Sequence, residues 1–238
     1  MAKRGKKYAS ARELVEGEKL YTPAEAVALV KKTAYAKFDE TVELHLRLGV
    51  DPRHADQQVR GVANLPAGSG KAVRILVFAE GEGARLAQEA GADYVGVDEF
   101  VEKIQQDWYD FDVAIATPQV MGKIGRLGRF LGRRGLMPNP KAGTIVQPDD
   151  LPRVIQEARQ GRVEFRVDRT SNLHIAIGKA SFTEDQLMAN LTSVMDTIER
   201  ARPSGAKGQY VRKVVLTSTM GPGIKMDIAQ TEALRPAA

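Results

Sequence analysis

Two stretches of the sequence combine basic residues with glycine, which suits contacts to phosphate groups. The first runs from Gly122 to Lys141, where six basic and no acidic residues are interspersed with five glycines. Glycines at this density weaken a helix by about 1 kcal/mol each relative to alanine, so we expect the stretch to end as a loop with an open backbone. Its candidates for phosphate contacts are Arg133, Arg134 and Lys141. The alternative is a basic surface loop that binds nothing.

The second stretch runs from Arg202 to Met226 and holds five basic and no acidic residues. It includes the run Thr217-Ser-Thr-Met-Gly-Pro222 at the end of an expected strand. Hydroxyl groups there could bond a ribose 2′-hydroxyl or a phosphate, and Gly221 would let an RNA backbone approach closely. A tight turn that closes the strand is the alternative.

Residues that could support catalysis or hold a metal form no recognisable constellation. The chain has no cysteine, and its three histidines, His45, His54 and His174, lack the spacing of a zinc site. His45 and His174 fall on polar strand faces, and we interpret them as ordinary surface residues. We therefore expect no catalytic residue, no metal and no cofactor.

Two glycine-containing stretches approach nucleotide-binding motifs without matching them. Residues 65–72 resemble the end of a phosphate-binding loop, but leucine and alanine stand where glycine and a hydroxyl residue are required. Residues 81–86 carry two glycines of the dinucleotide fingerprint and a leucine in place of the third. The alternative is that this chain is a nucleotide-using enzyme, but it lacks the nucleotide-binding motifs that such an enzyme requires.

The two ends of the chain predict helices packed on one face of an antiparallel sheet. Thr22 to Glu25 form a capping box that opens a helix to about residue 32. Strict alternation from Thr41 to Leu48 indicates a strand with one buried and one polar face. We expect further strands at 162–168 and 172–177, paired with each other, then a helix over 183–200 and a strand over 210–219. This order is typical of a split α+β, ferredoxin-like domain with an open sheet face, and the last dozen residues look frayed.

The middle of the chain alternates apolar strands with helices, which indicates a parallel sheet. Strands are expected at 73–79, 94–95 and 111–116, with helices after each and Asp98 capping one of them. The sequence therefore predicts an inserted three-layer, Rossmann-like α/β domain, entered through a linker over residues 65–70.

The distribution of net charge along the sequence supports the same division into two domains. Residues 1–67 carry +3, residues 68–158 carry −2 and residues 159–238 carry +4, within a total of +5. We therefore expect residues 1–67 and 159–238 to form one basic domain with an acidic partner, and residues 68–158 to form the insert. Apolar runs are too short to span a membrane, and no signal peptide is visible. Together with the lack of cysteine, this favours a cytoplasmic protein.

Several motifs resemble the bacterial large-subunit ribosomal protein L1 family. They are Lys37-Phe-Asp-Glu-Thr-Val-Glu43, Gly91-Ala-Asp93, the run from Gly132 to Thr144, Gly178-Lys-Ala-Ser-Phe182 and Thr219-Met-Gly-Pro222. The resemblance extends from about residue 5 to Ile228. One departure is Arg133 where many relatives have proline, which adds charge and removes stiffness from the loop.

The resemblance implies a protein of the mobile ribosomal stalk that is monomeric when free. Its domain of both chain ends would bind large-subunit rRNA, and the stalk would help deacylated exit-site tRNA to leave the ribosome. The family also represses its own operon by binding the mRNA. Phe38 could instead be a core aromatic residue, and Met220 a packed strand end. The RNA-contact positions of the family fall here on Lys37, Phe38, Thr41, Glu43, Arg166, Asp168, Ser181, Thr217, Thr219, Met220 and Gly221.

Overall fold

The computed structural model describes residues 5–234, and these divide into two compact units. The first unit comprises residues up to 70 together with those from 162 onward, and the second comprises residues 71–161. Both boundaries lie three residues beyond the expected ones. The reason at the first boundary is Asn190, whose side chain accepts a hydrogen bond from the Ala67 amide and donates to the Gly68 carbonyl. The expected linker is thereby part of the first unit.

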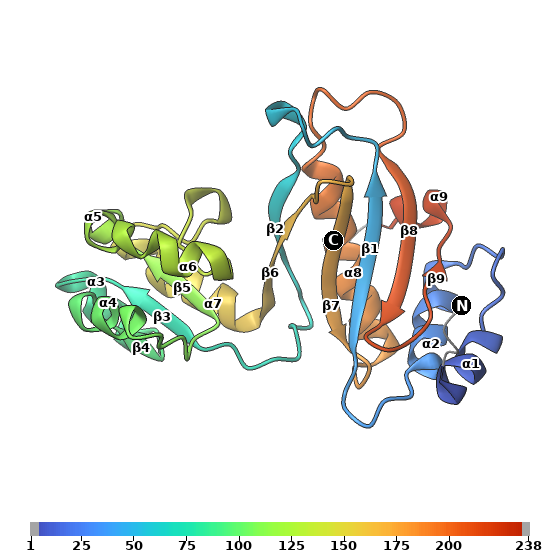
Figure 1. Cartoon of the computed structure of the whole chain (residues 1–238), viewed down its shortest axis with the longest axis horizontal. Helices are drawn as coiled ribbons and strands as arrows, with labels where there is room; N and C mark the ends of the chain where they lie inside the picture. The colour runs from blue at the N-terminus through green and yellow to red at the C-terminus, as the bar shows by residue number, and fades with distance from the viewer. Residues whose placement is uncertain (1–4, 235–238) are drawn as a thin grey trace. The chain divides into compact units, whose positions relative to one another are not determined.

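A four-stranded antiparallel sheet organises the first unit (Figure 1). In spatial order its strands are β7 (Asn172–Lys179), β1 (Thr41–Leu48), β8 (Val211–Ser218) and β9 (Ile224–Lys225). In the centre of the sheet His45 lies opposite His174 on β7 and opposite Val215 on β8. A separate antiparallel pair is formed by β2 (Arg60–Asn64) and β6 (Arg162–Arg166).

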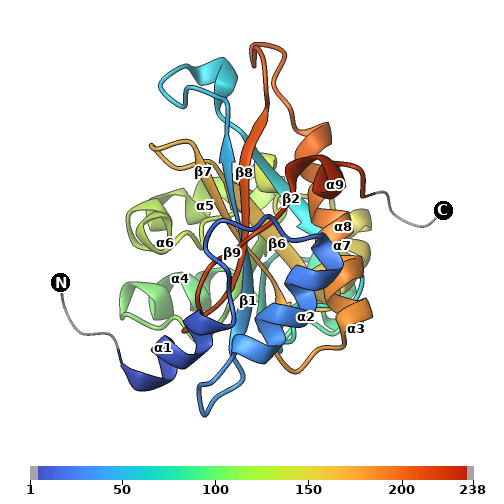
Figure 2. The same cartoon turned by 90° about the vertical axis from the view of Figure 1, so that its right-hand side faces the viewer.

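Two capped helices cover one face of the four-stranded sheet. They are α2 (Pro23–Thr33) and α8 (Glu184–Arg200), which pack against each other (Figure 2). Both begin with a complete capping box, at Thr22 and Thr183, which confirms the expectation for α2. The alternate apolar residues of β1 face these helices and are buried, so the polar residues of β1 lie on the opposite face. Two shorter helices, α1 (Lys6–Glu13) and α9 (Ile228–Glu232), complete the unit.

The second unit is a three-layer α/β arrangement, as predicted. Its parallel sheet has the order β4 (Tyr94–Val95), β3 (Ile75–Phe78), β5 (Val113–Ala116). Ile75 and Val77 pack against α3 (Glu82–Glu89) and α7 (Leu151–Gly161). Leu76 and Phe78 pack on the other side against α4 (Asp98–Gln105), α5 (Met121–Ile124) and α6 (Gly128–Arg134). Short 3-10 turns occur at Ala55–Gln57, Pro118–Val120, Gly125–Leu127, Pro140–Ala142 and Pro148–Asp150.

Several local predictions are wrong. The strand β6 pairs with β2 rather than with β7. Asp98 begins α4 without capping it. The expected fraying of the last dozen residues is wrong for residues 227–232, because Asp227 caps α9 and Thr231 is buried. Residues 235–238 of that prediction lie outside the described residues.

The glycine-rich run ends as a loop, as expected, but most of the run before that point is helical. Between its glycines lie Ile124, Leu127 and Leu131, all fully buried in the core of the second unit. Burial of each such side chain contributes about 1.5–3 kcal/mol, which exceeds the helix cost of the intervening glycines. Only after Gly135, which adopts a left-handed conformation with φ 72°, does the chain become a loop. In the described part of the chain no helix is long and apolar enough to cross a membrane.

Candidate nucleic-acid interface

The open face of the sheet, opposite α2 and α8, carries mixed polar residues in register across three strands. On β1 they are Thr41, Glu43, His45 and Arg47; beside them lie Lys179, Ala176, His174 and Asn172 on β7, and Thr217, Val215 and Lys213 on β8. We call this set the open face. It combines cations with hydroxyl and carboxylate acceptors, the groups that contact phosphates and ribose 2′-hydroxyls.

Glu40 joins two loops at one end of the open face. The residue is 1% exposed, and its carboxylate accepts hydrogen bonds from the Tyr35 and Ala36 amides at 2.8 and 2.7 Å. It also accepts from the Ser218 hydroxyl at 2.6 Å and the Met220 amide at 3.0 Å. Burial would raise the pKa of Glu40, but these hydrogen bonds, led by that from Ser218, lower it. Glu40 therefore stays ionised and ties residues 35–40 to residues 218–220; we call these segments the paired loops.

The paired loops present two large apolar side chains to solvent. Phe38 is 57% exposed and Met220 is 49% exposed. The alternatives of a core phenylalanine and a packed methionine are therefore wrong. The Tyr35 hydroxyl donates to the Met220 carbonyl at 2.9 Å, which adds a further link between the loops. Exposed aromatic rings on a fixed backbone provide surfaces on which unpaired bases can stack.

Hydroxyl groups beside the paired loops are held in place by internal hydrogen bonds. The Thr41 amide donates to the Thr219 hydroxyl oxygen at 3.0 Å, and Lys179 Nζ donates to the Thr41 hydroxyl oxygen at 2.8 Å. Ser181 donates to the Asp39 carboxylate through both its amide and its hydroxyl, at 3.0 and 2.7 Å. The side chains are thus oriented before any ligand arrives.

Gly221 is required for a reason that the sequence did not indicate. It does not adopt a positive φ, so strain of that kind is not the reason. A Cβ built at Gly221 would instead overlap the hydroxyl oxygen of Ser218, the group that donates to Glu40. A side chain at this position would therefore disturb the link between the paired loops.

A second group of candidate residues lies at the far end of β1. Asp168 lies in the turn between β6 and β7, where it accepts hydrogen bonds from the Asn172 and Thr170 amides, each at 2.8 Å. The bond from Asn172, with those from Thr170, lowers the pKa of Asp168 to about 2. Arg166 is exposed on β6.

The candidate residues therefore form two groups, with Glu43 on the open face between them. Asp168 and Arg166 make up the far group. The near group, around the paired loops, contains Lys37, Phe38, Thr41, Ser181, Thr217, Thr219, Met220 and Gly221.

Two histidines that we interpreted as ordinary surface residues are in direct contact. The Nδ1 atoms of His45 and His174 are 2.7 Å apart. Each ring also has a carboxylate near its Nε2 atom: Glu43 at 3.6 Å from His45, and Asp168 at 3.7 Å from His174. Alternation placed both histidines on polar strand faces, but the register between β1 and β7 that joins them cannot be obtained from spacing alone.

The basic residues of the second unit form a smaller cluster on α6. The guanidinium of Arg134 lies 3.8 Å from the centre of the Tyr109 ring. A surface hollow there is also lined by Arg129, Phe130, Arg133 and one acidic residue, Asp107. Lys141 is exposed in the loop after α6 and does not line the hollow.

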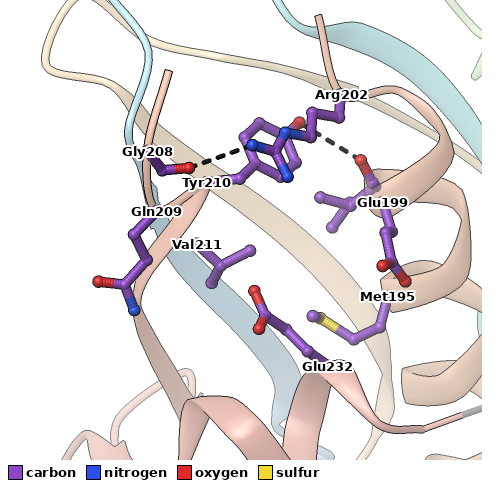
Figure 3. Close-up of a pocket in the computed structure, with 9 residues that line it drawn as sticks. Met195, Glu199, Arg202, Gly208, Gln209, Tyr210, Val211 and Glu232 are labelled. Atoms are coloured by element: carbon purple, nitrogen blue, oxygen red, sulfur yellow. Dashed lines mark hydrogen bonds between the residues drawn. The ribbon is translucent and has the colours of Figure 1, made fainter. Parts of the chain in front are cut away.

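A pocket in the first unit contains none of the candidate residues. It lies between the end of α8, residues 208–211 and Glu232 (Figure 3). Tyr210 donates its hydroxyl to the Ile198 carbonyl at 3.3 Å, and Arg202 donates to the Gly208 carbonyl at 3.1 Å. Burial raises the pKa of Tyr210 to about 12, against the opposing effect of Arg202. These hydrogen bonds hold the loop before β8 against the end of α8. Across the described residues no group of three acidic, histidine or cysteine side chains could hold a metal ion.

A family model and several similar proteins indicate the same protein family for this chain. The chain matches the model of the ribosomal protein L1p/L10e family over residues 30–222. It is 58% identical to the large ribosomal subunit protein uL1 of Chloroflexus aggregans, over 99% of this chain and all of that protein. It is 56% identical to the proteins of the same name from Dehalococcoides mccartyi, over 98% of this chain and 99% of the relative, and Thermomicrobium roseum, over 97% and 96%. The chain belongs to the ribosomal protein L1p/L10e family.

Proposed function

We propose that this chain is a non-enzymatic protein of the large ribosomal subunit that binds large-subunit rRNA directly. The names of its relatives, large ribosomal subunit protein uL1, support the place in the subunit. The protein would then be located in the cytoplasm, on the ribosome. The exposure of Phe38 and Met220 on loops that Glu40 joins is the observation that supports direct RNA binding most strongly.

The proposed contacts follow from the chemistry of each group. Lys37 and Arg166 offer positive charge to phosphates, whereas Glu43 and Asp168 accept hydrogen bonds from 2′-hydroxyls or base amino groups. Phe38 stacks on a base. Thr41, Ser181, Thr217 and Thr219 line the approach with hydroxyls, and the bare backbone at Gly221 lets the RNA backbone approach closely.

Binding of an rRNA helix-loop fragment tests this proposal. We expect Phe38→Ala to weaken binding about tenfold or more, because loss of a base–aromatic stack costs about 1–3 kcal/mol. Leu14→Ala is the matched control, since Leu14 is 55% exposed but lies at the end of α1. Equal affinities for the parent protein and a folded Phe38→Ala variant would exclude the paired loops as the binding site.

We assign rRNA binding to the first unit alone. A chain in which a short turn replaces residues 71–161 should fold and bind the same RNA. The register of β2 and β6 supports this design. Asn64, where the chain leaves β2, lies opposite Arg162, where the chain enters β6. A folded chain of this kind that binds no rRNA would refute the assignment.

We further propose that the same surface binds the mRNA of its own operon, and that the stalk assists release of deacylated tRNA from the exit site. The mRNA should compete with the rRNA fragment, and Phe38→Ala should weaken both. The α6 cluster of Arg133 and Arg134, together with Lys141 in the segment that follows α6, is the proposed second RNA surface. Charge reversal there should slow tRNA release from ribosomes while leaving rRNA affinity unchanged. The free protein should sediment as a monomer.

A further inference from the structure

The contact between His45 and His174 defines how many protons the pair can hold. Two Nδ1 atoms at 2.7 Å require one of them to donate a proton and the other to accept it. If both rings are neutral, the donating ring has a bare Nε2 atom that faces a carboxylate, which is unfavourable. If both rings are cationic, two N–H groups point at each other. A single added proton avoids both conflicts, because every ring nitrogen then has a suitable partner.

The surroundings disfavour a positive charge on the His45 ring. Burial lowers the pKa of His45, and the charge of His174 lowers it further, while Glu43 acts in the opposite direction. His174 is the more exposed ring, with 55% of its side chain accessible against 29% for His45. Protonated His174 would donate from Nδ1 to His45 and from Nε2 toward Asp168. Neutral His45 would keep its own proton on Nε2, toward Glu43.

The charges around the pair leave this part of the open face short of positive charge. Glu43 and Asp168 are the acidic groups that face the two rings. The other charged groups on this face are Arg47 on β1, Lys213 on β8 and Lys179 on β7, each displaced along the strands from the histidine pair. Lys225 on β9 lies opposite Val215, on the side of that residue away from His45. Val215, which lies opposite His45 on β8, contributes no charge. One proton on the pair leaves its local charge at −1, and a second proton brings it to zero.

We propose that His45 and His174 form a phosphate-binding pair on the open face, and that RNA binding is accompanied by uptake of a proton from solvent at this pair. The inference rests on the proposed function of the open face. A phosphate over the rings supplies the negative charge that makes the second proton favourable. It can also accept hydrogen bonds from the two rings, which then separate. Affinity for RNA should therefore rise as the pH falls, by up to tenfold per pH unit for one whole proton.

Calorimetry of the full chain with the rRNA helix-loop fragment measures this proton directly. Titrations at pH 7 in two buffers of different ionisation enthalpy, at equal ionic strength, give the number of protons taken up. We expect a measurable uptake for the parent protein and an affinity several times higher at pH 6 than at pH 8. The double variant His45→Gln, His174→Gln should take up no proton and bind with nearly constant affinity over this range. His54→Gln is the matched control, because His54 also faces an aspartate, Asp51 at 3.9 Å, but in a separate loop.

The possible outcomes separate this inference from the proposed function. Binding by the parent protein without proton uptake overturns the inference alone. Proton uptake that persists in the double variant, or disappears in His54→Gln, overturns it as well. Absence of binding at every pH overturns both. If the double variant does not fold, NMR of the three histidine rings in the parent protein decides, since RNA should raise the pH at which the His45 ring titrates.

Discussion

The carboxylate of Glu40 lies 2.6 Å from the hydroxyl of Ser218, although 178 positions separate the two residues in the chain. This contact joins the segment that precedes β1 to the segment that follows β8. It also fixes the position of Met220, whose amide donates to the same carboxylate oxygen. The position of the loop that carries Phe38 relative to Met220 therefore depends on the buried charge of Glu40.

Glu40→Gln should destabilise the protein by about 1–3 kcal/mol. The amide group cannot accept on both of its heavy atoms, so one of the two pairs of donors loses its partner in a buried site. Urea denaturation measures this loss, and hydrogen exchange should show faster exchange of the Met220 amide. Glu18→Gln, which removes an exposed carboxylate, should leave both measurements unchanged. Parent-like stability and exchange in Glu40→Gln would show that the charge does not hold the loops.

Gly221→Ala should destabilise the protein by about 1–3 kcal/mol, because its Cβ would overlap the Ser218 hydroxyl. Removal of that hydroxyl should relieve the overlap. We therefore expect Gly221→Ala to cost less in a Ser218→Ala background than in the parent. A double-mutant cycle measured by thermal unfolding gives the coupling between the two positions. Strictly additive effects would contradict the proposed overlap.

Two glycines, one within α6 and one directly after it, should respond in opposite ways to substitution by alanine. Gly132 lies within the helix with open space around it, so Gly132→Ala should stabilise the protein by up to about 1 kcal/mol. Gly135 has φ 72° at the end of the same helix, so Gly135→Ala should destabilise it by about 1 kcal/mol. Thermal unfolding of both variants checks the signs. A stabilising Gly135→Ala would be inconsistent with the left-handed helix end.

The contribution of Asp168 to stability should disappear in acid. Its pKa is lowered to about 2 in the folded protein from an ordinary value of 3.8. A lowered pKa means that the stabilisation is complete above the ordinary value and is lost as the pH falls toward 2. Asp168→Asn should therefore lower the melting temperature at pH 5, and the difference from the parent should shrink by pH 2.5. Glu13→Gln, with an exposed carboxyl on α1, is the control, and a difference that does not change with pH would contradict the prediction.

Local signals in the sequence were sufficient for most elements of the fold. The capping box at Thr22 and the alternation from Thr41 predicted α2 and β1 because both patterns involve residues within one element. Errors arose where the outcome depends on distant partners. The alternation of residues in β6 is compatible with pairing to either β7 or β2. Only assembly of the whole unit selects β2 as the partner.

The candidate site shows the same dependence on distant partners. The motifs identified the segments that carry Phe38 and Met220, but not that Glu40 would join them, because the Glu40 partners come from both ends of the chain. The histidine pair was missed because the two residues are 129 positions apart and meet only through strand register. For Gly221 the sequence suggested close approach of an RNA backbone, but it did not indicate that a side chain there would overlap the Ser218 hydroxyl.

The strand order β7-β1-β8-β9 has a consequence for synthesis of the protein. The central strand, β1, leaves the ribosome more than 120 residues before either of its neighbours. The whole second unit emerges between β1 and β7 and contains its own core, so it can fold first. During that interval the apolar side chains of β1 have no sheet to join, and both of its edges are unpaired. A nascent chain stalled before residue 172 should therefore be the form most prone to aggregate and most dependent on chaperones.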